Sequence, residues 1–382
     1  MIFMTHFDVA IIGSGPSGAT TAFYLAEKGI STVIIEKETL PRYKTCGGGF
    51  VFRGRKNMPF DISEVVEREF YEVDTYFGTK LHFKSKREKP VISMIMRDAF
   101  DHLIIKKAKE LGASLLEACK LTGLKFEEEK VILQTSQVEI SAKFVIAADG
   151  VLSPTAKYAG WKNDTRKLIP ALEYEVEVLE EDFERLSKEV RFDIDAVPNG
   201  YAWSFPKKNH LSLGVLTTKR SKINLKEYYA KYLKKLGVKT IISESQHGFQ
   251  IPVAPRTDGF FKNNVFLIGD AAGFADPITA EGISNAILSG KYAAEALIES
   301  ELNAKKAEQL YIEKLNVKIV PELHSGVFLA KYFYNKNPLR KLLLKKYGQH
   351  FGDLMVDILS GDKPFPTNVK ERMKEKIKEL LF

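Results

Sequence analysis

The sequence contains few cysteines. Cys46 and Cys119 are the two thiols among 382 residues, too few for a framework of disulfide bridges or for an iron–sulfur cluster held by about four thiolates. Cys119 precedes a stretch typical of a strand, and we interpret it as a core residue. The seven histidines lack the spacing of metal ligands, so we expect no metal site.

A targeting segment and a long uninterrupted apolar run are also missing. The first residues, MIFMTHFDVAIIG, lack the basic region and the cleavage signature of a signal peptide. The uncharged stretch from Val9 to Ala26 approaches the length of a membrane span, but its glycines and proline favour a strand, a turn and a helix. We therefore expect a cytoplasmic protein without a transmembrane helix.

The composition is that of an ordinary folded protein, with 45% apolar and 28% charged residues. A chain of this length predicts two domains, or one large domain with an additional lobe. The net charge is +8, and residues 301–382 hold 16 Lys and Arg against 10 Asp and Glu. No zinc spacing or aromatic RNA-binding motif accompanies this basic region, so we expect no nucleic-acid partner.

The N-terminal segment carries a dinucleotide-binding pattern. Residues 7–12 are almost wholly apolar and predict a buried strand, residues 19–28 predict a helix, and residues 31–35 predict a second strand. The turn at residues 13–18 reads Gly-Ser-Gly-Pro-Ser-Gly, and Glu36 follows the second strand. A GxGxxG motif in this order of elements is typical of dinucleotide binding.

Each residue type in this pattern has a physical role. Gly13 permits the tight turn, Gly15 lets the backbone approach a pyrophosphate, and Gly18 lets the helix pack closely on the strand. The helix N-terminus offers N–H groups and a partial positive charge to phosphates. The Glu36 carboxylate is placed to accept hydrogen bonds from a ribose. The pattern alone does not separate FAD from NAD.

Two later apolar strands also end in acidic residues. Residues 144–150 end in Asp149-Gly150, and residues 265–273 place Asp270 where a strand turns into a helix. A carboxylate there can hold sugar hydroxyls, and the helix start can face the negative charge of a reduced flavin. Each motif alone is also typical of an ordinary strand and turn, but the three motifs in this order favour a flavin nucleotide.

These segments resemble a known family. From residue 7 to residue 298 the chain is similar to the flavoproteins of the p-hydroxybenzoate-hydroxylase fold and, within them, to the geranylgeranyl reductase family. The motifs that carry the resemblance are residues 13–18, Pro41 to Gly49, Arg97 with Phe100-Asp101, Asp149-Gly150, Tyr201 to Lys207, and Gly269-Asp270 through Pro277 to Gly282-Ile283.

The resemblance implies an α/β fold with a Rossmann-type FAD-binding domain, an α+β second lobe with a mostly antiparallel sheet, and C-terminal helices. We expect the FAD-binding domain to be discontinuous, and alternating runs such as 211–215 favour strands in the second lobe. The expected bounds are 1–75, 97–165 and 255–300 for the FAD-binding domain, 76–96 and 166–254 for the substrate domain, and 301–382 for the helical region.

The stretch around Cys46 is the expected catalytic segment. Three glycines follow the thiol, so the backbone can lie against something flat such as a flavin ring. The resemblance implies that Cys46, Gly47 and Gly48 border the flavin, with the thiol on the substrate side. The thiol would orient substrate or donate a proton. The alternative is a small packing residue beside a flexible loop.

Three aromatic side chains form the expected substrate site. Tyr201, Trp203 and Phe205 alternate along an expected strand, so they share one face of it, and Pro206 ends the strand. Such a stripe is often ordinary core, but the resemblance implies that it lines the substrate cavity.

Arg97 begins a helix and is either a cofactor neighbour or a residue in a surface ion pair. Ala280 departs from the glycine that many family members have. Together the motif and the resemblance imply cofactor contacts from Gly13, Gly15, Pro16, Ser17, Gly18, Glu36, Lys37, Arg42, Cys46, Gly48, Gly49, Arg97, Asp149, Gly150, Gly269, Asp270, Pro277, Gly282 and Ile283.

The expected function is an FAD-dependent reductase that hydrogenates C=C bonds of a polyprenyl lipid or a related hydrophobic substrate. The electron donor, NAD(P)H or ferredoxin, is not readable from the sequence. Two alternatives stay open: a flavin-dependent monooxygenase or halogenase acting on a hydrophobic or aromatic substrate, and an electron-transfer flavoprotein acting on quinone. We expect a monomer.

The last residues form a basic amphipathic pattern. Val369, Met373, Ile377 and Leu381 recur every four residues, with lysines and an arginine between them. The pattern predicts either a helix docked on the core or a helix on a membrane surface. In the second case the protein would be peripheral at the inner face of the membrane.

Overall fold

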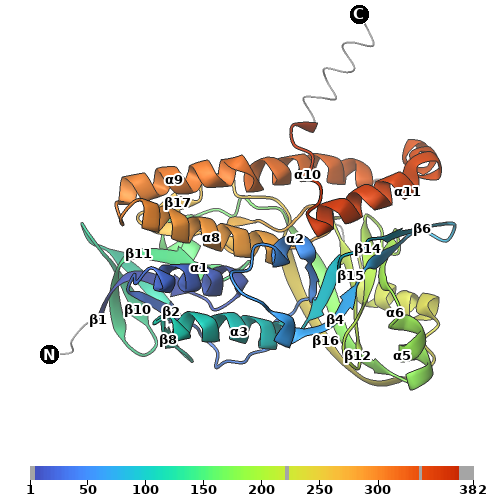
Figure 1. The fold of residues 1–382 in the computed structure, drawn as a ribbon, viewed down its shortest axis with the longest axis horizontal. Helices are drawn as coiled ribbons and strands as arrows, with labels where there is room; N and C mark the ends of the chain where they lie inside the picture. Colours follow the sequence, from blue (N-terminus) through green and yellow to red (C-terminus); the bar gives the residue numbers. More distant parts are fainter. Residues whose placement is uncertain (1–4, 220–222, 335–337, 370–382) are drawn as a thin grey trace, which may run out of the picture. The chain divides into compact units, whose positions relative to one another are not determined.

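The computed structural model describes residues 5–219, 223–334 and 338–369. Its chain forms two compact units, each assembled from three stretches of sequence (Figure 1). Unit 1 comprises Met1–Tyr43, Asp98–Lys167 and Pro252–His324, and unit 2 comprises Lys44–Arg97, Leu168–Ile251 and Ser325–Phe382. Residues 44–75, which the sequence grouped with the nucleotide-binding domain, thus fall in unit 2, and residues 301–324 fall in unit 1.

Unit 1 is built on an eight-stranded sheet. Its strand order is β17-β18-β11-β1-β2-β8, with β10 and β9 added beside β11. The strands are β1 (Thr5–Ile12), β2 (Thr32–Ile35), β8 (Ser114–Leu116), β9 (Leu121–Phe126), β10 (Val131–Thr135), β11 (Glu139–Ala147), β17 (Phe261–Lys262) and β18 (Val265–Leu267). The run from β18 to β8 is parallel throughout, which confirms the expected Rossmann-type sheet.

The three strands singled out from the sequence are direct neighbours in this sheet. β18 pairs with β11, and β11 pairs with β1, all in parallel. Parallel strands end at the same edge, so the turns after Ile12, Ala147 and Leu267 come together there. Apolar residues buried in β1 explain why it lies in the middle.

Helices accompany the sheet of unit 1. They are α1 (Pro16–Glu27), α3 (Arg97–Glu110), α4 (Pro154–Tyr158), α7 (Gly269–Ala272), α8 (Ile283–Glu299) and α9 (Ala304–Val317). α8 packs against both α1 and α9 (Figure 1). A Cβ on Gly290 of α8 would stand 2.3 Å from the Ser17 carbonyl oxygen, so glycine allows α8 to approach α1 closely.

Unit 2 contains a seven-stranded sheet, with the order β16-β12-β15-β14-β13-β5-β6. The strands are β5 (Glu72–Phe77), β6 (Leu81–Lys86), β12 (Leu168–Val178), β13 (Val190–Ile194), β14 (Gly200–Pro206), β15 (Leu211–Thr217) and β16 (Ile241–Pro252). All the pairings with a described register are antiparallel except β13 with β5, which confirms the expected mostly antiparallel sheet.

The remaining elements of unit 2 are short strands and peripheral helices. A three-stranded sheet has the order β3-β7-β4. These elements are β3 (Gly49–Val51), α2 (Phe52–Arg55), a 3-10 turn (Ser63–Val65), β4 (Val66–Phe70), β7 (Ile92–Ile95), α5 (Glu180–Leu186), α6 (Leu225–Leu236), α10 (Ile319–Phe333, which begins in unit 1) and α11 (Pro338–Ser360). The expected C-terminal helices are therefore present as α9, α10 and α11.

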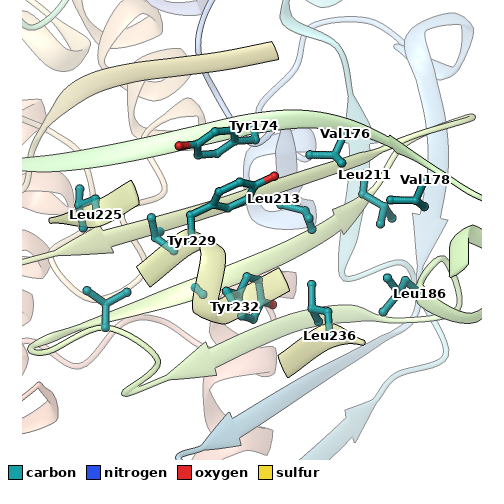
Figure 2. Packing of buried hydrophobic residues seen from close by; sticks show 13 residues of the cluster. Tyr174, Val176, Val178, Leu186, Leu211, Leu213, Leu225, Tyr229, Tyr232 and Leu236 are labelled. Carbon is teal, nitrogen blue, oxygen red and sulfur yellow. The ribbon is translucent and has the colours of Figure 1, made fainter. Parts of the chain in front are cut away.

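The central strands of the unit 2 sheet have two different faces. On one face, α6 covers a hydrophobic cluster to which β12 and β15 contribute alternate residues (Figure 2). Ala202 of β14 also belongs to this cluster. The rings of Tyr174 from β12 and Tyr229 from α6 stack face to face there, with centroids 3.5 Å apart. Because side chains alternate along a strand, the residues between these positions point to the opposite face. That face carries Trp203, Phe205 and Glu173.

Candidate functional site

The turn between β1 and α1 fits the role expected of a nucleotide cradle. Gly13 has a φ of 103°, and a Cβ there would stand 2.5 Å from the Ala148 carbonyl oxygen. A Cβ on Gly18 would stand 2.1 Å from the Gly13 carbonyl oxygen. Neither position can take a side chain, so the turn keeps its backbone close to the end of β11.

The N-terminus of α1 has hydrogen-bond donors to offer an anion. Gly15 is its N-cap residue, Pro16 follows it, and no side chain in the described part of the chain caps this end. The first N–H groups of a helix have no acceptor within the helix. A pyrophosphate at this point would satisfy them and the helix dipole together.

Glu36 is a buried carboxylate directly after β2. Its Oε2 accepts hydrogen bonds from the backbone N of Ser14 at 3.0 Å and from the Ser14 hydroxyl at 2.5 Å. Burial alone would raise the pKa of Glu36, but the Ser14 hydrogen bonds and the Arg42 charge outweigh it and lower the pKa. The carboxylate is therefore ionised and suited to accept hydrogen bonds from a ribose.

Arg42 connects this carboxylate to a second acid. Its Nε lies 3.5 Å from Glu36, and its Nη1 donates to the fully buried Asp101 at 3.1 Å. The sequence marked Asp101 only as part of a family motif and gave it no partner. Lys37, by contrast, is 68% exposed and pairs with Glu38.

Asp149 holds the turn that follows β11. Its carboxylate accepts from the Ser153 hydroxyl at 2.6 Å and from the Thr155 backbone N at 2.9 Å. Burial raises the pKa of Asp149 even though these hydrogen bonds act against the rise. Gly150, next to it, has a φ of 78°. In the structure Asp149 therefore fixes the local backbone, and Gly150 supplies the turn.

Asp270 lies in the short helix α7, between β18 and α8. Gly269, with a φ of 52°, precedes it, and a Cβ on Gly282 would stand 3.4 Å from the Asp270 Oδ1. Arg166 is buried and donates to the carbonyl oxygens of Asp270 and Val151, at 2.6 Å each. This arginine ties two of the three turns together, and the sequence analysis missed it because no motif contains it.

The segment before α8 is a tight turn. The Asp276 carboxylate accepts from the backbone N of Ile278 at 2.9 Å and of Thr279 at 2.7 Å, around Pro277. Ala280 has a φ of 58°, in the left-handed region that favours glycine. The substitution noted in the sequence thus falls at a position where glycine is the unstrained residue. Gly282 and Ile283 follow as the N-cap and first residue of α8.

The glycines after Cys46 lie against unit 2 itself. A Cβ on Gly47 would stand 2.9 Å from the Trp203 Nε1, and one on Gly49 would stand 2.9 Å from the Phe205 ring. A Cβ on Gly48, whose φ is 65°, would stand 2.1 Å from the Ile95 carbonyl oxygen. Protein neighbours therefore suffice to explain all three glycines. Cys46 is partly exposed, and its Sγ accepts from the Gly48 backbone N at 3.4 Å.

Tyr201, Trp203 and Phe205 point to the same side of β14, as the alternation predicted. The Trp203 ring is 6.0 Å from the Tyr201 ring and 6.3 Å from the Phe205 ring. The Trp203 indole lies across Gly214 of β15, because a Cβ there would stand 1.9 Å from it. Its buried Nε1 has no hydrogen-bond partner in the described residues. An orphaned buried donor is unusual in a plain core and favours a binding site.

Lys207 anchors the Cys46 loop. It is fully buried, and its Nζ donates to the carbonyl oxygens of Gly47 and Ile95, at 2.8 Å each. Burial lowers the pKa of Lys207, against the charges of Glu175 and Cys46, which would raise it. From the sequence, Lys207 is the last residue of the aromatic motif, but no role was predicted for it.

An acid pair lies next to this lysine and was missed by the sequence analysis. Glu173 and Glu175 are alternate residues of β12 and share a face. Burial, and then the neighbouring Glu175, raise the pKa of Glu173 to about 8. Burial acts on Glu175 as well, but hydrogen bonds from His210 and Glu173 outweigh it and lower the pKa of Glu175. His210 lies 2.9 Å from Glu175.

Several other expectations concern single positions or absences. Cys119 is fully buried, which confirms it as a core residue, and Arg97 is the first residue of α3 as expected. Among the described residues no helix is long and apolar enough to span a membrane, and no three or more acidic, histidine or cysteine side chains gather as a metal site. Met373, Ile377 and Leu381 of the amphipathic pattern lie outside the described residues.

Comparisons with known proteins agree with this geometry. A family model described as an FAD binding domain matches residues 6–53 and 63–310. An uncharacterized protein of Methanosarcina barkeri is 32% identical over 356 residues, covering 91% of this chain and 89% of the relative. The digeranylgeranylglycerophospholipid reductase of Methanosarcina acetivorans is 26% identical over 347 residues, covering 86% and 85%.

A solved structure is similar over nearly the whole chain. It is that of a geranylgeranyl bacteriochlorophyll reductase-like protein from Thermoplasma acidophilum. The TM-score is 0.77 at 26% identity, and the match covers 97% of this chain and 96% of that one.

Proposed function

The chain belongs to the FAD binding domain family and is an FAD-dependent oxidoreductase related to the geranylgeranyl reductases; on this premise we propose that it hydrogenates C=C bonds of a polyprenyl lipid. The observation that carries the proposal is an aromatic stripe against the Cys46 loop, in a chain whose relatives include a named reductase of geranylgeranyl lipids.

The proposal assigns nucleotide binding to unit 1. The backbone at Gly13, Gly15 and Gly18 would lie against the pyrophosphate, and Glu36 would accept from the ribose. Arg42 would compensate the negative charge there. The other proposed contacts are Pro16, Ser17, Lys37, Cys46, Gly48, Gly49, Arg97, Asp149, Gly150, Gly269, Asp270, Pro277, Gly282 and Ile283.

The proposal assigns substrate recognition to unit 2. Tyr201, Trp203 and Phe205 would bind the hydrocarbon chain, because aromatic rings offer large apolar surface with a defined geometry. Bound FAD supplies two-electron chemistry: it takes electrons from a donor and passes a hydride to an acceptor. Cys46, Gly47 and Gly48 would hold the substrate with its double bond next to the bound flavin. The Cys46 thiol would donate a proton to the carbon of the double bond that does not receive the hydride.

A direct assay tests this function. Protein reduced with dithionite under anaerobic conditions is incubated with a geranylgeranyl glycerophospholipid, with geranylgeranyl diphosphate and with a prenylated quinone, and each product is weighed by mass spectrometry. The expected result is a gain of two hydrogens per double bond in one lipid class. If no lipid gains mass, while an aromatic compound stimulates NADPH-dependent oxygen uptake, the protein is a monooxygenase and the proposal is wrong.

Three finer parts of the proposal concern partners. The electron donor is proposed to be NAD(P)H or a reduced ferredoxin, and the protein is proposed to act as a monomer. Peripheral contact with a membrane is proposed for residues 369–382. Co-sedimentation with anionic vesicles before and after removal of these residues tests that contact, and equal recovery in the pellet would reject them as the anchor.

A further inference from the structure

The two acids of β12 lie on the same face of the sheet as the substrate aromatics. In the strand register Glu173 faces Gly214 and Glu175 faces Ser212, both on β15. Gly214 in turn faces Trp203 on β14, whose indole lies across it. The Ser212 hydroxyl donates to Glu173 at 3.3 Å. The carboxylates are therefore part of the surface on which the Cys46 loop rests.

The titratable groups around the pair come from three segments: the turn between β14 and β15, the loop before β3, and β4. Lys207 directly follows β14, and His210 directly precedes β15. Cys46 lies in the loop before β3. The negative charge of Glu67, on β4, opposes the lowering of the Lys207 pKa by burial. The Nζ of Lys207 already donates to two carbonyl oxygens of the loop segment and β7. The Lys207 ammonium group balances the charge of one of the two buried carboxylates. It cannot balance both at once, so the protonated form of the other is favoured.

The exposed fraction of these side chains decreases from His210 through Glu175 to Glu173. The His210 side chain is 16% exposed and the Glu175 side chain 12%, whereas Glu173 is 2% exposed. His210 contacts Glu175, and the neighbouring Glu175 adds to burial in raising the pKa of Glu173. The backbone of Cys46 in turn lowers the pKa of Glu173 against this rise, which places Glu173 next to the Cys46 loop. A series of interacting groups thus leads from the protein surface to the Cys46 loop.

We propose that Glu173 and Glu175 share one proton, that this proton replaces the one lost at the Cys46 loop in each reduction, and that His210 refills the pair from solvent. The proposal rests on the proposed function. Each reduced C=C bond takes up one hydride and one proton, and two C–H bonds replace one π bond. The hydride electrons come from reduced flavin, which is thereby oxidised. A dihydronicotinamide or a reduced ferredoxin must then reduce the flavin again.

The proton balance follows from this arrangement. The Cys46 thiol gives its proton to carbon and takes one from the Glu173–Glu175 pair, which then takes one from His210. Glu173 and Glu175 act through Cys46 and so position and supply the proton without touching the reacting carbon. Each cycle leaves the cluster as it began and removes one proton from the solvent.

A purely structural ion cluster would behave differently on substitution. Glu173→Gln keeps a side-chain oxygen that accepts from Ser212 next to the Cys46 loop, so the loop keeps its support, but the amide holds no acid proton. Glu177→Gln is the matched control, because Glu177 is exposed on the same strand and its contact is with Ser243. Both variants should bind FAD and be reduced like the wild type.

The test is repeated anaerobic turnover with excess dithionite and the lipid that the wild type reduces, because only the second and later turnovers need a new proton on Cys46. The rate of lipid reduction is measured over a range of pH. We expect the wild-type rate to fall as the pH rises through about 8. Glu173→Gln should be at least tenfold slower with no such fall, in line with the usual effect of a lost acid. His210→Asn should keep the first turnover and slow repeated turnover. A Glu173→Gln variant with the rate and pH profile of the wild type would overturn the proposal.

A second readout is independent of lipid reduction. Infrared difference spectra of the oxidised protein, taken below and above about pH 8, should show a protonated carboxyl band that Glu173→Gln removes and Glu177→Gln keeps. Absence of that band in the wild type overturns the shared proton. If the band is present but no lipid is reduced, the proposed function fails while the proton pair stands.

Discussion

At the scale of single residues, the candidate site in each unit contains a buried charged side chain with identified hydrogen-bond partners. Glu36 in unit 1 and Lys207 in unit 2 are both buried, and each holds a segment that the proposed chemistry needs. Removing one partner of a buried hydrogen bond leaves the other unsatisfied, which costs about 1–3 kcal/mol. Substitutions at these two residues therefore test the account sharply.

Lys207→Met should destabilise unit 2. Methionine fills a similar volume but donates no hydrogen bond, so the carbonyl oxygens of Gly47 and Ile95 lose their donor. We expect the free energy of unfolding, measured in urea, to fall by about 1–3 kcal/mol. Lys208→Met is the control, since Lys208 is exposed and should lose little. Equal losses in the two variants would show that Lys207 anchors nothing.

Glu36→Gln should weaken FAD binding. The amide accepts a ribose hydroxyl less strongly than an ionised carboxylate, and it no longer balances Arg42. We expect the dissociation constant of FAD, measured by titration of the apoprotein, to rise about tenfold or more. Glu38→Gln, at an exposed residue paired with Lys37, should leave it unchanged. An unchanged affinity in Glu36→Gln would remove Glu36 from the cofactor site.

At the scale of elements, the sheet pairings decide which side chains meet. β15 places a glycine next to Trp203, and that gap is where the indole lies. Gly214→Ala should push the indole away, since the added Cβ would stand 1.9 Å from the ring. We expect loss of lipid reduction with FAD content retained.

Gly123→Ala is the matched control for this prediction. It also adds a methyl group to a strand glycine, but the nearest atom would be the flexible end of Gln134. Lipid reduction should then persist. Reduction that survives in Gly214→Ala, with an unchanged Trp203 emission spectrum, would remove Trp203 from the substrate site.

The sequence predicted those elements whose residues are close together in the chain. β1, its glycine turn and α1 form a local pattern, and alternation along β14 predicted a shared face for Tyr201, Trp203 and Phe205. Ala280 was noticed because one residue departed from a pattern, and its φ of 58° gives the physical reason. Local patterns work because the backbone alone fixes turns and strand faces.

Contacts between distant segments could not be predicted in this way. Arg166 lies over 100 residues from Asp270, and Glu173 meets the Cys46 loop only because β12 pairs with β15. Neither residue belongs to a sequence motif. The sequence also could not predict that Trp203, Phe205 and Ile95 lie beside the glycines that follow Cys46.

At the scale of the whole molecule, Glu173 should make stability depend on pH. Below about pH 4.5 the carboxyl is protonated in folded and unfolded chains alike. Between about 4.5 and about 8 the unfolded chain loses this proton while the folded chain keeps it, so stability falls as the pH rises. Glu175, whose pKa is lowered, contributes the opposite trend at pH values below its usual range.

Urea unfolding followed at several pH values from about 5 to about 8 measures this dependence. The midpoint for the wild type should fall across the range, and Glu173→Gln should flatten the profile because its amide does not titrate. Glu177→Gln should retain the wild-type slope. A wild-type midpoint that rises with pH over this range, and does so equally in Glu173→Gln, would contradict the raised pKa.

The most direct test of the account as a whole is a stoichiometry. Protein with its FAD fully reduced is mixed anaerobically with excess geranylgeranyl lipid, and flavin reoxidation is compared with the double bonds lost in the lipid. We expect one double bond to be saturated for each FAD reoxidised. Flavin that stays reduced in the presence of every prenyl lipid, yet is oxidised at once by quinone or oxygen, would contradict it.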